Sequence, residues 1–322
     1  MTSTLTPERL PIVTIGGFLG AGKTTLVNHI LHSQNQGRTV VFVNDFGAIN
    51  IDYSMIDTVE ADRISLKNGC VCCSLNDDFV ASVADFAREA EPPDLVVVEA
   101  SGVSDPRALD ASLDALEAAN LTQLDSRIYV IDSDNFHRFE FEDTEQIIDH
   151  AAASDLIILN KTDLASNDAI AKIEKTLAEA APFSRLLKAS HCGVHAELLT
   201  GLTARIDLKS VKQALRKTKA GENHIDKYTQ WSFETESVLN RDAFDVFARS
   251  LPDICLRAKG FLRFAEAEDK VFTFNLVGHR ATLEQSSKPV TGAKSQIIAI
   301  GITGKVLPDK LSRGFEKTLV RH

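Results

Sequence analysis

A phosphate-binding loop is the feature that most constrains the fold of this chain. Residues 17–24 read Gly-Phe-Leu-Gly-Ala-Gly-Lys-Thr and fit the pattern G-x-x-x-x-G-K-[ST], between an apolar run and a stretch with helical apolar periodicity. Glycine lets backbone N–H groups turn towards phosphate, and a helix N-terminus adds partial positive charge. The alternative is a glycine-rich turn that binds nothing. The pattern predicts a nucleotide site formed by Gly17, Gly20, Ala21, Gly22, Lys23, Thr24 and Thr25.

The chemistry of phosphoryl transfer assigns roles to individual residues. Lys23 is expected to reach the β- and γ-phosphates, and the Thr24 hydroxyl to hold Mg²⁺. Glu99 ends an apolar run and is expected to bind Mg²⁺ through water or to polarise the attacking water; the alternative is a solvated carboxylate at a strand end. The N–H of Gly102 is expected to sense the γ-phosphate. Because Val103 stands where Ras-like enzymes have a water-orienting glutamine, slow intrinsic turnover is predicted.

A second motif indicates which base is bound. Residues 160–163 read Asn-Lys-Thr-Asp after a short apolar run, and this N-K-x-D pattern predicts base contacts from Asn160, Lys161 and Asp163. The Asp163 carboxylate accepts hydrogen bonds from the N1–H and 2-amino groups of guanine, whereas adenine leaves such an acceptor unpaired. The segment Ala189-Ser190, which follows Arg185-Leu186-Leu187-Lys188, resembles the less specific loop that closes over the base, so Ser190 is a further candidate for a base contact. The nucleotide is therefore predicted to be GTP or GDP.

The order of apolar and amphipathic segments predicts an α/β fold. Nearly unbroken runs of Val, Ile and Leu suit strands buried on both faces of a parallel sheet. The fold class is a P-loop NTPase with a doubly wound, mostly parallel sheet, followed by a smaller α+β domain. The expected strands of the first part are 11–18, 39–45, 94–100, 127–132 and 155–161, and two of its helices are 76–91 and 167–181.

The chain is expected to divide into a GTPase domain, 1–207, a polar linker, 208–227, and a C-terminal domain, 228–322. The pattern changes beyond the linker, where strands no longer alternate with helices. The expected strands there are 229–237, 261–267, 271–277 and 296–302, with helices at 241–250 and 309–319.

Composition bounds the class of protein. The 322 residues carry a formal net charge of −10, so broad binding to nucleic acid or to anionic lipid is not expected. The sequence has no run of about 18 apolar residues and no secretory signal, which predicts neither a membrane span nor export. Together with the cysteine usage below, this predicts a cytoplasmic protein.

Three of the five cysteines, Cys70, Cys72 and Cys73, lie within four residues. Three thiols this close in the sequence can supply soft ligands for Zn²⁺, Cu(I) or another late transition metal. The alternatives are small buried side chains or a thiol redox switch. His191 and His195 would form a secondary site only on a helix, and ordinary loop residues are the favoured interpretation. Cys255 and His279 are interpreted as a packing and a surface residue.

Taken together, the motifs resemble those of the CobW-type metallochaperone GTPases. They are Gly-Gly-Phe-Leu-Gly-Ala-Gly-Lys-Thr-Thr, Asn-Asp-Phe-Gly, Cys-Val-Cys-Cys, Glu-Ala-Ser-Gly-Val-Ser-Asp-Pro and Asn-Lys-Thr-Asp, with Arg-Ala-Lys-Gly-Phe and Ser-Gln-Ile in the second domain. Two features depart from the family pattern. Ala48 replaces an acidic residue, although Asp45 keeps an acid nearby as a further candidate ligand of Mg²⁺. The linker has only His224, whereas many members carry a histidine-rich linker.

The resemblance implies GTP-dependent binding of a transition metal, zinc most often, at the Cys-x-Cys-Cys motif and its transfer to a client protein. The expected cofactors are GTP, Mg²⁺ and Zn²⁺, with Co²⁺ as another metal, and the expected partners are the client and a second copy of the chain. Two other functions stay open at this stage: a metal- or redox-sensing regulatory GTPase, and a cobalt or nickel insertase of a cofactor pathway.

Overall fold

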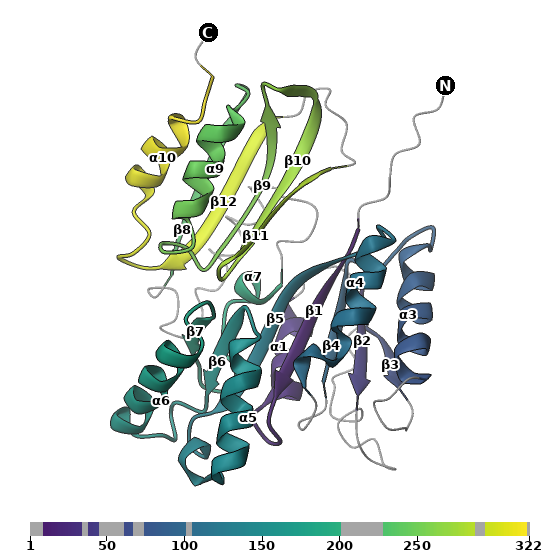
Figure 1. Ribbon diagram of the computed structural model, residues 1–322, viewed down its shortest axis with the longest axis vertical. Coiled ribbons are helices and arrows are strands. Elements are labelled where there is room, and N and C mark those ends of the chain that lie inside the picture. The colour runs from purple at the N-terminus through teal and green to yellow at the C-terminus, as the bar shows by residue number, and fades with distance from the viewer. Residues whose placement is uncertain are drawn as a thin grey trace. The chain divides into compact units, whose positions relative to one another are not determined.

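The computed structural model describes residues 9–33, 38–44, 61–66, 74–100, 105–200, 228–286 and 294–320 (Figure 1). The chain divides into two compact units, one formed by Arg9–Thr203 and the other containing Ala204–His322. The predicted linker lies outside the described residues. None of the described helices combines the length and the apolar content needed to cross a lipid bilayer.

The first unit is built on a seven-stranded sheet with the order β3-β2-β4-β1-β5-β6-β7. Every pairing in it is parallel, so the prediction of a mostly parallel sheet is confirmed. The strands are β1 (Leu10–Gly17), β2 (Thr39–Asn44), β3 (Ala61–Leu66), β4 (Leu95–Glu99), β5 (Thr122–Asp132), β6 (Leu156–Asn160) and β7 (Arg185–Lys188). The carboxyl ends of all seven strands consequently lie along one edge of the sheet.

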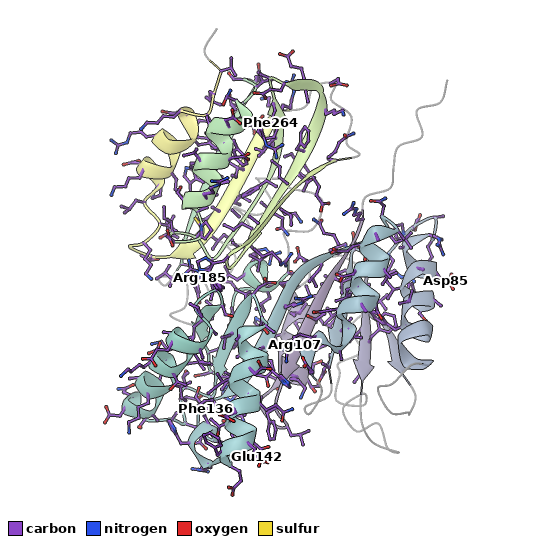
Figure 2. The ribbon with its side chains drawn as sticks, viewed as in Figure 1. Asp85, Arg107, Phe136, Glu142, Arg185 and Phe264 are labelled. Atoms are coloured by element: carbon purple, nitrogen blue, oxygen red, sulfur yellow. The ribbon has the colours of Figure 1, made fainter. Side chains whose placement is uncertain are left out.

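Helices cover both faces of this sheet. They are α1 (Lys23–Ser33), α3 (Ser74–Ala87), α4 (Asp110–Ala118), α5 (Phe141–Ala152), α6 (Asn167–Ala180) and the short α7 (Ala196–Leu199), with 3-10 turns η1 (Pro106–Leu109) and η2 (Phe136–Arg138). On one face, Ile12, Val40 and Val96 pack with Phe79 of α3 and with α4. Further along that face, Tyr129 and Ile157 pack with α5 and α6, and Phe136 joins them (Figure 2). The alternate residues of β1 point to the opposite face, where α1 and α7 contact each other.

The second unit is an antiparallel sheet with two helices on one face. Its order is β11-β10-β9-β12-β8. The elements are β8 (Tyr228–Thr235), α9 (Arg241–Ser250), β9 (Arg257–Phe264), β10 (Ala267–Val277), β11 (Arg280–Gln285), β12 (Ser295–Ile302) and α10 (Pro308–Glu316). Trp231, Phe244 and Phe315 form the core between sheet and helices, together with Phe264 (Figure 2). Cys255 lies in this core, 1% exposed, as expected of a packing residue.

Six strand assignments differ from the prediction. β5 begins at Thr122 rather than at residue 127, and β10 at Ala267 rather than at residue 271. β9 spans Arg257–Phe264 rather than 261–267, because Arg257 and Lys259 interrupt its apolar pattern while their backbones pair with β10 and β12. β3, β7 and β11 were not predicted as strands. Each of these three lies at the edge of its sheet, where one side of the strand has no neighbour and polar residues are tolerated.

Candidate nucleotide site

The phosphate-binding loop joins the end of β1 to the start of α1 with backbone conformations that require glycine. Gly17, Gly20 and Gly22 have φ angles of 147°, 74° and 108°. A Cβ atom at Gly17 would lie 2.5 Å from the carbonyl oxygen of Val130, and one at Gly22 would lie 2.5 Å from Nδ2 of Asn160. The loop is thus closely packed from behind as well as strained, and side chains are excluded from the positions that the sequence motif reserves for glycine.

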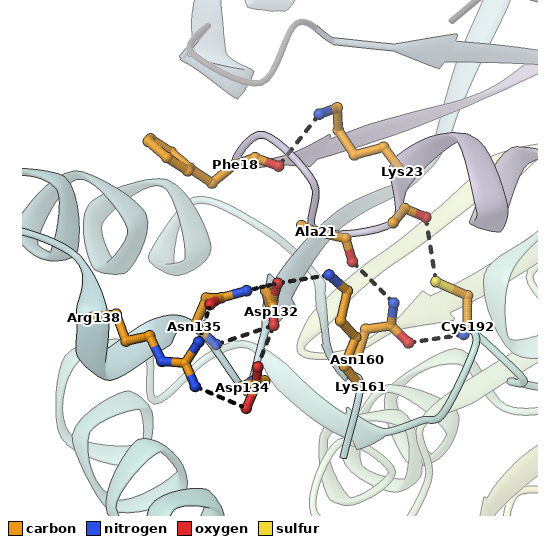
Figure 3. Close-up of polar contacts among 11 residues, drawn as sticks. Phe18, Ala21, Lys23, Asp132, Asp134, Asn135, Arg138, Asn160, Lys161 and Cys192 are labelled. Atoms are coloured by element: carbon orange, nitrogen blue, oxygen red, sulfur yellow. Dashed lines mark hydrogen bonds and ion pairs between the residues drawn. The ribbon is translucent and has the colours of Figure 1, made fainter. Parts of the chain in front are cut away.

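The polar groups expected to handle phosphate and magnesium meet at this loop. Lys23 is 7% exposed, and its Nζ donates a hydrogen bond to the carbonyl oxygen of Phe18, 3.5 Å away (Figure 3). The hydroxyl of Thr24 donates to Oε1 of Glu99 at 3.0 Å, and Glu99 is 2% exposed at the end of β4, beside β1. A hydroxyl and a carboxylate this close form a hard oxygen donor set, which fits Mg²⁺ bound next to a phosphate. Thr25, the next residue of α1, is exposed.

Asn160 connects the phosphate-binding loop to the loop that follows β7 (Figure 3). Its Nδ2 donates to the carbonyl oxygen of Ala21 at 2.9 Å, and its Oδ1 accepts from the backbone N–H of Cys192 at 2.8 Å. The Cys192 thiol in turn donates to the carbonyl oxygen of Gly22 at 3.3 Å. One buried amide therefore fixes two loops that are far apart in the sequence.

The two segments predicted to contact the base lie together, joined by Thr162. Its hydroxyl donates to the carbonyl oxygen of Ala189 at 3.0 Å and lies 3.5 Å from the hydroxyl of Ser190. The backbone N–H of Thr162 donates to the same carbonyl at 3.1 Å. Asp163 follows with an exposed side chain, so its carboxylate is accessible to a ligand.

Asp132 was not predicted as a site residue, but it contacts the segment that contains the N-K-x-D motif. It ends β5 directly beside Asn160, is 4% exposed, and its Oδ2 is 2.7 Å from Nζ of Lys161 (Figure 3). Burial would raise its pKa, but the hydrogen bonds from Lys161 and Asn135 outweigh burial and lower the pKa below its usual value. Asp132 is therefore held as a carboxylate. The signal that was available is its position: an acid at the end of an apolar strand, like Glu99.

Cys192 was also not predicted as a residue of the site. It is fully buried, and burial raises the pKa of its thiol to about 12, which makes it an unreactive packing group. His191 and Cys192 have φ angles of 51° and 55°, so this segment is not helical and does not place His191 and His195 on one helix face. Among the described residues, no group of three or more His, Cys, Asp or Glu side chains is arranged to hold a metal ion.

Five predicted site residues lie outside the described part of the chain. They are Asp45, Cys70, Cys72, Cys73 and Gly102. The cysteine segment is bounded by described elements, because β3 ends at Leu66 and α3 begins at Ser74.

Comparison with known proteins identifies related chains. The first two are a protein of Dictyostelium discoideum named zinc-regulated GTPase metalloprotein activator 1 and one of Sinorhizobium sp named zinc chaperone CobW. The first is 27% identical over an alignment of 327 positions, which covers 86% of this chain and 67% of the relative. The second is 27% identical over 268 residues, which span 73% and 76%. The solved structure of the Zn(II)-bound YjiA GTPase from E. coli aligns with 97% of this chain and 99% of its own, at 19% identity and a TM-score of 0.45.

The family match covers both units. Residues 228–319 match the cobalamin synthesis protein cobW C-terminal domain. Residues 11–187 match the family described as CobW/HypB/UreG, nucleotide-binding domain. The resemblance that the sequence motifs indicated is confirmed, and the chain belongs to the CobW/HypB/UreG family.

Proposed function

We propose that this protein is a GTP-hydrolysing metallochaperone that binds zinc at Cys70, Cys72 and Cys73 and transfers it to a client protein. The two relatives reported above carry names that describe a zinc chaperone and a zinc-regulated GTPase activator of metalloproteins. Family membership supports the nucleotide-binding half of this cycle. The cysteines must stay reduced to bind metal, and we expect the protein to act in the cytoplasm, where thiols are kept reduced.

The chemistry of the nucleotide half follows from the side chains at the loop. We expect Lys23 to offset the negative charge that develops on the γ-phosphate, and Asp163 to read guanine. Thr24 and Glu99 supply oxygen ligands for Mg²⁺, with Asp45 as a third candidate. When bound, Mg²⁺ neutralises phosphate charge during transfer. Gly102 is the third residue after Glu99, and we expect its backbone N–H to respond to the γ-phosphate.

One structural observation carries the link between nucleotide and metal. Ser65, Val43 and Glu99 occupy one row across β3, β2 and β4, because Val43 pairs with both of the others. Neighbouring strands are about 4.8 Å apart, so the backbone of Ser65 lies roughly 10 Å from that of Glu99. The cysteine segment begins two residues later, after Leu66. The chain therefore enters this segment at the same edge of the sheet as the proposed magnesium ligand.

This proximity gives a physical route for coupling. Three thiolates repel one another unless a cation neutralises them, and the arrangement that gathers them is favoured when nucleotide holds the neighbouring loops in place. Hydrolysis then loosens the thiolate site and releases the metal to the client. Because coupling between two binding sites is reciprocal, zinc must raise the affinity for GTP by the same factor.

The test is a metal titration in three nucleotide states: a non-hydrolysable GTP analogue with Mg²⁺, GDP with Mg²⁺, and no nucleotide. Co²⁺ serves as the probe, since thiolate ligation gives intense charge-transfer absorption. Metal affinity should be about 5- to 150-fold tighter with the GTP analogue than with GDP, which is the range typical of allosteric coupling.

Cys72→Ser should abolish the charge-transfer band. Cys255→Ala is the matched control, because Cys255 lies in the core of the second unit, and this variant should bind Co²⁺ like the unchanged protein. Equal metal affinity in all three nucleotide states would show that no chaperone cycle of this kind operates.

A further inference from the structure

We propose that Asp132 is a positioning residue for base recognition, which holds Lys161 and thereby fixes the guanine-reading loop. This inference rests on the proposed GTP-binding function and adds a residue that the N-K-x-D motif does not contain. Asp132 is 28 residues upstream of Asn160 in the sequence but is its direct neighbour in the sheet, where β5 pairs with β6.

The Asp132 carboxylate receives four hydrogen bonds. Its Oδ1 accepts from the backbone N–H groups of Asp134 and Asn135, at 3.0 and 3.2 Å. Its Oδ2 accepts from Nδ2 of Asn135 at 2.8 Å and from Nζ of Lys161 at 2.7 Å (Figure 3). Three of these donors belong to the turn after β5 and hold the carboxylate still. The fourth belongs to the base-reading loop, so a rigid acceptor is presented to Lys161.

Lys161 needs such an anchor because of its backbone. Its φ angle is 59°, in the left-handed region that costs a non-glycine residue free energy and persists only where the surroundings enforce it. This residue turns the chain between Asn160 and Thr162, and Asp163 follows two positions later. The direction in which Asp163 presents its carboxylate therefore depends on the conformation of Lys161.

The loop has three separate anchors. Asn160 is fixed by Ala21 and Cys192, Thr162 is fixed by Ala189, and Lys161 is fixed by Asp132. The Asp132 side chain is 4% exposed and that of Lys161 is 30% exposed, so solvent screens this ion pair less than a surface pair. Removing one partner would leave the other charge without its counter-ion in a largely buried place.

The substitution Asp132→Asn tests whether the carboxylate acts as the acceptor for Lys161. An amide keeps the size of the side chain but replaces one acceptor oxygen by an NH₂ donor, and all four groups around it are donors. At least one donor would face another donor, and Lys161 would lose its charged partner. Lys161→Met removes the same ion pair from the other side.

Asp134→Asn is the matched control. The Asp134 side chain pairs with the exposed Arg138 at 3.7 Å, and only the backbone of Asp134 reaches Asp132. The same chemical change, two residues away, therefore leaves the Asp132–Lys161 pair intact.

The experiment measures equilibrium affinities of the full-length protein for GTP and for ITP, which lacks the 2-amino group that Asp163 is expected to read. In Asp132→Asn and in Lys161→Met, the GTP affinity should fall about tenfold, the loss typical of one charged hydrogen bond. The preference for GTP over ITP should shrink at least about threefold, because the carboxylate of Asp163 is no longer held in position. The double variant should lose no more than either single variant.

The ratio of the two affinities separates positioning from stability. A variant that only reduces the folded fraction lowers both affinities by the same factor and leaves their ratio unchanged. An unchanged ratio in Lys161→Met overturns the inference, as does an equal shift in Asp134→Asn; Lys161→Met carries the test alone if Asp132→Asn does not fold. If the unchanged protein shows no preference for guanine at all, it is the proposed function that fails.

Discussion

Replacing Gly22 by alanine tests how contacts with Asn160 and Cys192 constrain the phosphate-binding loop. The matched comparison is Gly20→Ala, because both glycines have positive φ angles, 108° and 74°, in one loop. A Cβ atom at Gly20 has no atom within 4 Å, whereas a Cβ atom at Gly22 would lie 2.5 Å from Nδ2 of Asn160 and 3.2 Å from Sγ of Cys192. The two variants therefore share backbone strain and differ in a side-chain collision.

The difference in stability follows from these contacts. Left-handed backbone at Gly20 costs an alanine roughly 1–2 kcal/mol, and the less favourable φ of Gly22 costs about 1–3 kcal/mol. At Gly22 the Asn160 amide must also move, which gives up two hydrogen bonds worth about 0.5–1.5 kcal/mol each. Gly22→Ala should therefore be less stable than Gly20→Ala by about 2 kcal/mol, roughly a thirtyfold change in the unfolding equilibrium.

The assay is urea unfolding followed in two ways. Circular dichroism reports on both units, whereas the emission of Trp231, the only tryptophan, reports on the second unit, where its ring packs against Phe247 and Phe315. The Trp231 transition should be the same in both variants. A loss of stability at Gly20→Ala as large as that at Gly22→Ala would show that the Asn160 amide does not constrain the loop.

Two further predictions concern catalysis and pH. Lys23→Ala should reduce GTP turnover at least about a hundredfold, on the order of 3 kcal/mol of barrier, and undiminished hydrolysis would locate the activity elsewhere. Burial lowers the pKa of His150 below its usual value, against the raising effect of Asp105 and Asp149. The stability from keeping this ring neutral is then complete above about pH 6.5 and is lost as pH falls through the folded-state pKa. His150→Phe, which keeps an aromatic ring beside Tyr129, should flatten the dependence of the urea midpoint on pH in this window; an unchanged slope would exclude His150 as its source.

Whether a strand could be predicted from the sequence depended largely on its position in the sheet. Interior strands such as β1 and β6 are buried on both faces, and their unbroken apolar runs indicated them clearly. The strands that were missed, β3, β7 and β11, are all edge strands. An edge strand pairs on one side only, so its sequence is free to be short or polar, and the pairing partner that makes it a strand is not visible in its own residues.

The same distinction applies within the nucleotide site. Lys23 and Thr24 belong to a contiguous motif, and they were predicted as site residues because strand, glycines and helix stand next to one another in the sequence. Asp132 and Cys192 were not, because their roles are contacts with residues that are distant along the chain. The local pattern marks Asp132 only as an acid at the end of an apolar strand, and it does not show the partners of either residue. The parallel pairing of β5, β6 and β7 brings both residues to the loop.

Gly22 shows what these distant contacts add to the meaning of a motif. The sequence motif explains this glycine by the freedom of its backbone N–H to turn towards phosphate. In the structure, the space where a Cβ atom would stand is also taken, by Asn160 and Cys192. Asn160 thus belongs to the base-reading motif and at the same time sets the shape of the phosphate-binding loop through Ala21. We therefore expect binding of the base and binding of the phosphates to depend on each other. A variant of Asn160 should weaken the binding of every nucleotide, whereas a variant of Asp163, which has an exposed side chain, should change only the choice of base.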